Sequence, residues 1–115
     1  MNIEDARLYC LSKENATEDF PFDETTLVFR IEGKIFACVS LLDTSWFCVK
    51  CDPERALLLR EEWQYIAPAW HWNKKYWNQL DIEHLPDELV MQCIDHSYDE
   101  VIKKFPKKIR VKYGR

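Results

Sequence analysis

The pair Glu32-Gly33 separates two runs of residues that favour β-strands, and this arrangement constrains the fold more than any other feature of the chain. The two runs read TLVFRI and KIFACVSL, and both are rich in valine, isoleucine and phenylalanine. Such residues favour strands, and a glycine-bearing pair between two such runs is typical of a tight turn. The sequence therefore predicts an antiparallel β-hairpin that turns at residues 32–33.

Helices are predicted before and after this hairpin. Asn2 is a favourable N-cap for a first helix, and Asp52 followed by Pro53 is typical of the start of a second one. A third helix is expected to begin at Pro86 and to end before Pro106. It has one apolar stripe, with residues at spacings of three and four: Leu89, Val90, Cys93, Ile94, Ser97, Val101, Ile102 and Phe105.

The remaining segments are expected to be turns and strands. The acidic residues 15–23 are predicted to form a turn, and a second turn at Leu42–Ser45 precedes a third strand at Trp46–Cys51. After the second helix, an extended segment begins at Tyr65–Ala67. It continues in two halves joined around Asn73-Lys74-Lys75, namely Trp70–Trp72 and Tyr76–Ile82.

These elements follow one another in the order α-β-β-β-α-β-β-α. Strand hairpins combined with helices predict an α+β domain of two layers, in which helices pack on an antiparallel sheet. The chain has 115 residues, of which 47% are hydrophobic, so we expect residues 1–115 to form a single domain with a proper core.

The charge is distributed unevenly along the chain. Residues 103–115, which read KKFPKKIRVKYGR, contain seven basic residues and no acidic one. The net charge of −4 therefore divides into +7 on this basic tail and −11 on the rest of the chain. Because a general basic coat is absent, any contact with nucleic acid is expected to be local. A solvated, solubilising end explains the tail equally well.

The composition also bears on the compartment. The first residues carry charges throughout and do not resemble a signal peptide, and the chain has no run of about 18 apolar residues that would span a membrane. Its five scattered cysteines are typical of reduced, buried thiols rather than of a disulfide framework. We therefore expect a cytoplasmic protein that does not contact a membrane.

Four segments, taken together, resemble the MmcQ/YjbR family: DFPFDETTLVFRIEGKIFA, DPERALLLRE, IAPAWHWNKKYWNQLDI and LPDELVMQCIDHSYDEVIKKFPKK. The resemblance runs from the first helix to the basic tail. It implies a two-layer α+β fold like that of secretion chaperones. It also implies DNA binding through a "double wing" of β-hairpins.

Two motifs carry most of this resemblance. The first, P-A-x-H-x-N-K-K-x-W, corresponds here to Pro68, Ala69, His71, Asn73, Lys74, Lys75 and Trp77. The second is the run Asp95-His96-Ser97-Tyr98. This chain departs from the usual family sequence at Trp72, where a Met or similar residue is common, and at Trp70, which is often Tyr. Both changes keep a large apolar group.

Metal and catalytic chemistry are less favoured than binding. Cys48 and Cys51 form a lone CxxC, but residues three apart on a strand point to opposite faces, and no second pair completes a zinc site. The histidines are far apart in sequence, and the two glycines exclude phosphate-binding loops of the glycine-rich kind. We therefore predict a protein that is not an enzyme and that has no metal or cofactor site.

The aromatic stretch PAWHWNKKYWN supports two interpretations. Alternation along a strand places Trp70 and Trp72 on one face and Trp77 on the other, so at least one ring is expected in the core. The lysines at the expected hairpin tip suit phosphate contact or simple solvation. The DNA hypothesis assigns contacts to the hairpins and the tail, at these residues: His71, Asn73, Lys74, Lys75, Lys103, Lys104, Lys107, Lys108, Arg110 and Lys112.

A second hypothesis treats the chain as a protein-interaction module, either a monomer or a homodimer with a chaperone-like role. The charge of −11 outside the tail motivates it, because an acidic body repels DNA but suits a protein partner.

Overall fold

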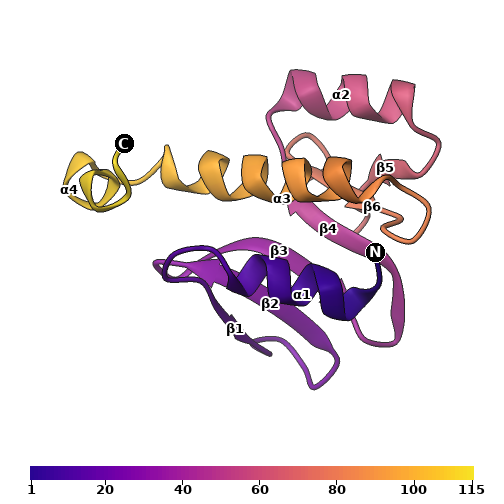
Figure 1. Cartoon of the computed structure of the whole chain (residues 1–115), viewed down its shortest axis with the longest axis horizontal. Helices are drawn as coiled ribbons and strands as arrows, with labels where there is room; N and C mark the ends of the chain where they lie inside the picture. Colours follow the sequence, from indigo (N-terminus) through magenta and orange to yellow (C-terminus); the bar gives the residue numbers. More distant parts are fainter.

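A six-stranded antiparallel sheet runs through the computed structural model, which describes all of residues 1–115 (Figure 1). The strands lie in the order β1-β2-β3-β4-β6-β5. Their bounds are β1 (Thr17–Asp19), β2 (Thr26–Ile31), β3 (Lys34–Ser40), β4 (Asp43–Lys50), β5 (Ile66–Pro68) and β6 (Trp77–Leu80). This arrangement confirms the predicted α+β class with an antiparallel sheet.

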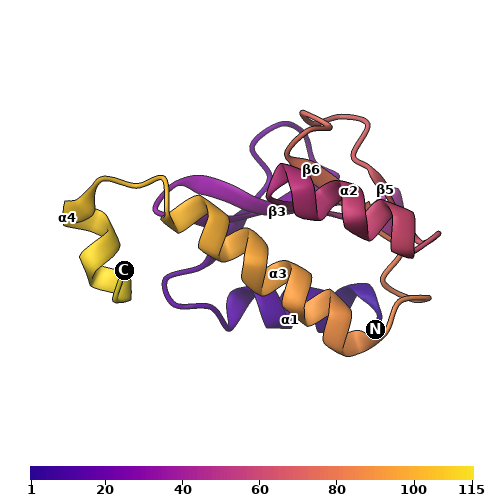
Figure 2. The same ribbon diagram turned by 90° about the horizontal axis from the view of Figure 1, so that it is seen from above.

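Three longer helices form the second layer, and two short ones follow at the C-terminus (Figure 2). Their bounds are α1 (Ile3–Leu11), α2 (Pro53–Glu62), α3 (Asp87–Ile102), α4 (Lys107–Arg110) and the 3₁₀-helix η1 (Val111–Tyr113). All three longer helices contribute to one core cluster with the residues of β2 to β4 that alternate toward them, such as Phe29, Val39 and Phe47. None of the helices is long and apolar enough to cross a membrane.

The hairpin between β2 and β3 forms at the predicted residues because its turn requires an unusual backbone. Glu32 has φ 48° and Gly33 has φ 80°, so both residues lie in the left-handed region that favours glycine. One further residue is inserted into β3 near Phe36, where the register with β2 shifts. This bulge turns the Phe36 side chain into the core, where its ring contacts that of Tyr98 with centroids 5.5 Å apart.

The helix starts follow from the capping residues that the sequence provides. The side chain of Asn2 accepts a hydrogen bond from the Asp5 amide, and the Asp5 carboxylate accepts one from the Asn2 amide. At the second helix, the Asp52 carboxylate accepts from the amide of Arg55, and Pro53 occupies the first turn. These two starts agree with the sequence prediction.

Three local expectations differ from the structure. Thr17–Asp19 forms the edge strand β1 within the segment expected to be a turn, because Glu18 pairs with Arg7 and Asp19 pairs with Arg30. The turn between β3 and β4 occupies only residues 41–42, so β4 begins earlier than predicted. Residues 70–72 belong to a loop rather than a strand, and β5 ends at Pro68.

This loop, residues 69–76, folds over the sheet face opposite the three helices, which we call the open face. The Trp72 indole stacks on that of Trp77, with centroids 4.4 Å apart, and meets the ring of Phe22 edge-on at 6.4 Å. Trp77 is only 7% exposed beneath it, whereas Trp70 is 65% exposed. The expectation that at least one tryptophan of this stretch is buried is therefore confirmed.

Candidate functional site

Two hairpin ends and the end of α3 meet at one end of the sheet. The β2–β3 hairpin turns there at Gly33, and β4 reaches the same end at its last residue, Lys50, because β4 runs antiparallel to β3. Lys50 pairs with Trp77, the first residue of β6. The loop 69–76 that leads into β6 therefore emerges at this end too.

A groove of about 570 Å³ lies between these elements, and we call it the basic groove. The β2–β3 hairpin forms one wall and the end of α3 forms another, while aromatic rings from the loop and β6 complete it. Its lining residues are Arg30, Gly33, Lys34, Ile35, Lys50, Trp72, Trp77, Val101, Lys104 and Phe105.

Positive charge accumulates in the basic groove without full compensation. Burial lowers the pKa of Lys50, and the charges of Lys104, Lys103 and Lys34 lower it further against the opposing effect of Glu100. Lysine charges that lie close enough to lower the pKa of Lys50 repel its ammonium group. A bound anion would relieve that repulsion, so the electrostatics of the groove favour an anionic ligand.

Tyr76 joins the loop to the beginning of the basic tail. The Lys75 ammonium lies 5.5 Å from the centre of its ring, and the Lys104 ammonium lies 5.1 Å from it. Both contacts are within the range of cation–π attraction. Lys75 and Lys104, which are predicted site residues far apart in sequence, are thus brought together.

Other predicted residues of the tail are partly neutralised. The Lys103 ammonium forms an ion pair with Glu100 at 2.6 Å, and Lys112 lies 3.9 Å from a carboxylate oxygen of Glu32. In both pairs the lysine is exposed and the carboxylate is less so, and each pair reduces the charge available to a ligand. Lys103 and Lys112 therefore contribute less positive potential than their number in the sequence implies.

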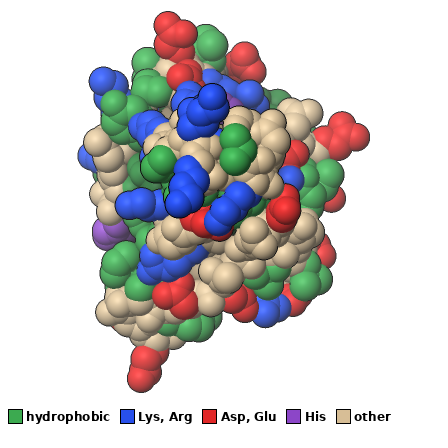
Figure 3. All heavy atoms as spheres, turned by 90° about the vertical axis from the view of Figure 1, so that its left-hand side faces the viewer, with side chains coloured by type: hydrophobic (Ala, Val, Ile, Leu, Met, Phe, Trp, Pro, Cys, Tyr) green, Lys and Arg blue, Asp and Glu red, His purple; other side chains and the backbone are tan.

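The basic tail is folded into α4 and η1 rather than extended. Lys107 and Lys108 are exposed on α4, whereas Arg110 is half-buried and its Nε atom is buried without a partner. Figure 3, which views the molecule from the end that carries α4, shows Lys and Arg side chains gathered near its centre with acidic ones between and around them. The tail thus extends the positive surface beyond the basic groove.

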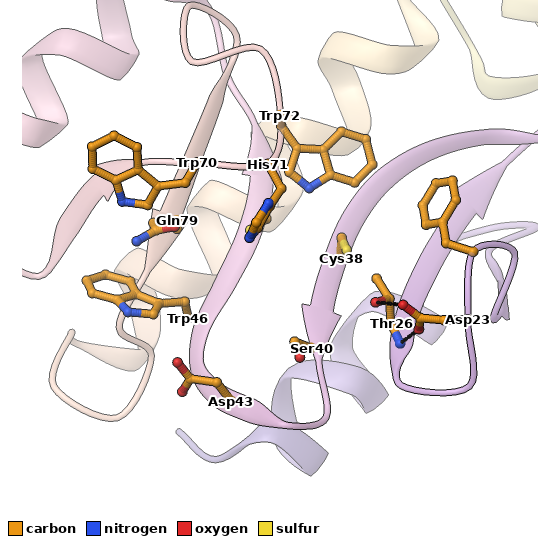
Figure 4. A pocket seen from close by; sticks show the side chains of 12 residues that line it. Asp23, Thr26, Cys38, Ser40, Asp43, Trp46, Trp70, His71, Trp72 and Gln79 are labelled. Atoms are coloured by element: carbon orange, nitrogen blue, oxygen red, sulfur yellow. Dashed lines mark hydrogen bonds between the residues drawn. The ribbon is translucent and has the colours of Figure 1, made fainter.

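The predicted residues at the loop tip point in different directions. The Lys74 ammonium lies 4.2 Å from the centre of the Trp70 ring, and His71 lines a second hollow on the open face (Figure 4). The Asn73 carboxamide oxygen accepts a hydrogen bond from the Lys75 amide at 3.1 Å, so it stabilises the turn itself. The structure therefore separates Lys74 and His71 from the basic groove.

Arg60, on α2, fixes the position of this loop. Its guanidinium donates to the Asn78 side-chain oxygen at 2.6 Å and to the main-chain oxygens of Lys74 and Trp77. Asn78 is buried and also donates to the carbonyl of Ala56. The loop is therefore tied to α2 by charge-assisted hydrogen bonds.

The motif Asp95-His96-Ser97-Tyr98 holds separate elements together. His96 Nε2 accepts a hydrogen bond from the Asp52 amide at the start of α2, at 3.1 Å. Asp95 accepts one from the Tyr9 hydroxyl on α1, at 2.7 Å. Burial lowers the pKa of His96, and the charge of Arg55 adds to this effect. The neutral ring is the form that accepts the Asp52 hydrogen bond.

The other two residues of the motif bind the sheet and the N-terminal region. Ser97 is fully buried; its hydroxyl donates to the Phe36 carbonyl at 2.5 Å and accepts from the Lys50 amide at 2.9 Å. The Tyr98 hydroxyl donates to the Glu14 carbonyl at 2.7 Å. This motif therefore orients α3 against the rest of the domain, and it lines neither hollow.

The cysteines have two separate environments. Cys48 lies beside Cys38 on the open face, whereas Cys51 lies in the core near Cys93. The two residues of the CxxC therefore do not face each other. Burial raises the pKa of Cys48 and of Cys51 to about 12, which disfavours the reactive thiolate. No group of three or more metal-ligating side chains is present.

Sequence reasoning missed Arg30, Lys34 and Lys50, which supply much of the charge of the basic groove. Each lies in a strand, and only the strand register places them at the same end of the sheet. Arg30 and Lys34 flank the predicted turn at residues 32–33, and Lys50 lies near the end of a predicted strand. Their positions at strand ends were the available signal, because the ends of adjacent antiparallel strands meet. That signal requires the strand order, which the sequence does not provide.

Known proteins resemble this chain over most of its length. The family model described as YjbR matches residues 11–100. The Escherichia coli K12 protein named "Uncharacterized protein YjbR" is 28% identical over 112 residues, which cover 96% of this chain and 95% of that protein. The protein named "Uncharacterized protein YbdF" from Escherichia coli O157:H7 is 32% identical, covering 77% of this chain and 75% of that protein.

Solved structures also resemble this chain over most of its length. The crystal structure of the Deinococcus radiodurans protein DR2400 has a TM-score of 0.90 and 34% sequence identity, covering 98% of this chain and 88% of that one. A Pseudomonas syringae protein has a TM-score of 0.71 with 23% identity over 84% of this chain and 96% of that one, which shows the shared fold. The chain belongs to the YjbR family.

Proposed function

We propose that this protein binds DNA without catalysing a reaction, and that the basic groove receives the phosphate backbone. The observation that carries the proposal is the meeting of both hairpin ends with the end of α3 around a groove lined by basic and aromatic side chains. Lysines bind phosphates, and aromatic rings provide stacking surfaces for bases. The resemblance to DNA-binding "double wing" proteins supports the same function.

Three lysines are expected to carry most of the affinity: Lys34, Lys50 and Lys104. The fourth basic residue of the groove, Arg30, already pairs with Asp19 at 2.8 Å. Each phosphate contact releases counterions. In a plot of the logarithm of the binding constant against the logarithm of the salt concentration, each contact therefore contributes about −0.9 to the slope. Three contacts therefore predict a slope of about −3.

A salt titration with a short, fluorescently labelled duplex tests this proposal. Anisotropy measured between about 50 and 200 mM salt should give the slope of about −3, and the double variant Lys50→Gln/Lys104→Gln should reduce its magnitude to about 1. Lys74→Gln is the matched control, because Lys74 has the same charge but lies against Trp70, away from the groove. It should change the affinity less than twofold, within about 0.4 kcal/mol.

Two outcomes contradict the proposal. The first is the absence of binding at about 50 mM salt, where phosphate contacts are strongest. The second is an equal loss of affinity in the control and the double variant, because general attraction to a charged chain would then explain the binding. The measurement needs no cofactor, and we place the protein in the cytoplasm, where its five free cysteines would stay reduced.

A protein-interaction role is a second candidate, and exposed leucines favour it. Leu57 and Leu58 on α2 are 58% and 57% exposed, and Leu42, in the β3–β4 turn, is 82% exposed. Apolar surface of this kind is typical of a contact with another protein or a second copy of the chain. Light scattering coupled to size exclusion would reveal a dimer, and Leu57→Ser with Leu58→Ser should dissociate it. A monomer at all concentrations would count against this candidate.

A further inference from the structure

The open face of the sheet contains a pocket of about 890 Å³, which the proposed function does not use. We call it the open-face pocket. Its floor is a row of side chains from three neighbouring strands, since Cys38 on β3 pairs with Cys48 on β4 and Cys48 pairs with Gln79 on β6. The volume is within the range of sites for small organic molecules.

Indole rings surround this floor. Trp46 comes from β4, and Trp70 and Trp72 come from the loop 69–76. The Trp72 ring is held between Trp77 and Phe22, so that wall of the pocket is already formed without a ligand. Trp70 is largely exposed, and an exposed indole offers a stacking surface for a flat ring.

Gln79 is the polar group that points to the kind of ligand. It is only 8% exposed, lines the pocket, and its carboxamide, unlike that of Asn78, forms no hydrogen bond within the protein, so it is open to the pocket alone. Figure 4 shows this carboxamide between the rings of Trp46 and Trp70. The neighbouring Asn78 is also buried, but its carboxamide accepts a hydrogen bond from Arg60 and donates one to the Ala56 carbonyl. A carboxamide with no partner in the protein is free to pair with a ligand, so a ligand with a matching polar edge gains those hydrogen bonds.

The charges at the rim limit what the ligand can carry. Asp23 and Asp43 both line the pocket. Hydrogen bonds from the amides of Thr25 and Thr26 lower the pKa of Asp23, which therefore stays ionised at neutral pH. These carboxylates repel a phosphate group but accept a neutral or cationic ring. His71 adds an imidazole that can donate or accept a hydrogen bond.

We propose that the open-face pocket binds a planar heteroaromatic ring with an adjacent donor and acceptor, of which a purine base is the model, and that Gln79 pairs with its polar edge. A carboxamide presents a donor and an acceptor side by side and matches the polar edge of adenine. The ring stacks on Trp46 or Trp70. The inference goes beyond DNA binding in the basic groove and stands independently of it.

The first test is a titration with adenosine, in which binding is measured by tryptophan fluorescence and by calorimetry. Saturable binding at concentrations up to about 1 mM is expected, with AMP binding more weakly because of the acidic rim. Gln79→Leu should weaken adenosine binding at least about tenfold, the loss of one to two buried hydrogen bonds. It should not destabilise the fold, because it removes an unpaired polar group. Gln92→Leu is the control, since Gln92 is exposed on α3.

Two further measurements show whether the ring comes from a nucleic acid or from a free nucleoside, and they distinguish this inference from DNA binding in the basic groove. If a short single strand of deoxyadenosines binds more tightly than adenosine, the natural ligand is an unpaired base of a nucleic acid. If the strand binds more weakly, the natural ligand is a free nucleoside. In both cases Gln79→Leu must reduce the affinity. Lys50→Gln/Lys104→Gln should still bind adenosine even where duplex binding is lost. Absence of saturable adenosine binding, or equal binding by Gln79→Leu, overturns the inference.

Discussion

Replacing Ser97 by alanine should destabilise the domain by about 2–4 kcal/mol. The hydroxyl of Ser97 is fully buried and satisfies two main-chain groups, the Phe36 carbonyl on β3 and the Lys50 amide on β4. Alanine leaves both groups buried without a partner, and each such loss costs about 1–3 kcal/mol. The small volume change adds little, because only one oxygen atom is removed. A loss of this size is a large part of the 5–15 kcal/mol typical of a whole domain.

Urea denaturation monitored by tryptophan fluorescence measures this loss directly, and the transition should shift to lower urea with an unchanged slope. Ser12→Ala is the control, because Ser12 is exposed and its hydroxyl bonds only to the nearby Tyr9 carbonyl. That variant should stay within about 0.5 kcal/mol of the original protein. If Ser97→Ala also stays within that margin, the reasoning that this motif residue holds α3 to the sheet is refuted.

Two further predictions concern the contacts of α2, one with His96 on α3 and one between Arg60 and the loop 69–76. Because the folded protein lowers the pKa of His96 below its ordinary value of 6.5, the unfolded chain binds a proton more readily, and the unfolding free energy should fall as the pH drops below about 6.5. His96→Gln should flatten that dependence in urea denaturation curves recorded between pH about 5 and 8. Arg60→Ala should lower stability by about 1–3 kcal/mol and accelerate hydrogen exchange in residues 69–76, whereas Glu61→Ala, exposed on the same helix, should do neither.

The local rules of the sequence predicted most of the fold. The turn at Glu32-Gly33 was predictable because glycine tolerates the left-handed backbone found there. Edge strand β1 was not, because Thr17–Asp19 lacks strand-forming apolar residues and is held by ion pairs to Arg7 and Arg30. Those partners come from other elements, so only the tertiary structure places them.

The candidate site was predicted less completely, for a physical reason. Lys75 and Lys104 were expected to contribute, and the structure brings them to the same ring of Tyr76. The alternation of tryptophans wrongly predicted a strand at residues 70–72, since Trp72 instead folds back onto Trp77. Period-two alternation records which residues are large and apolar, but a loop that covers a sheet produces the same pattern.

The position of Trp72 has a thermodynamic consequence, because its ring lines both the open-face pocket and the basic groove. A ligand that shifts this indole on one side alters the wall of the other side. Linkage then requires the effect to be reciprocal: each ligand changes the affinity of the other by the same factor. A substitution at Trp72 should therefore perturb both proposed binding equilibria at once, and its effect is interpretable only when both are measured on the same variant.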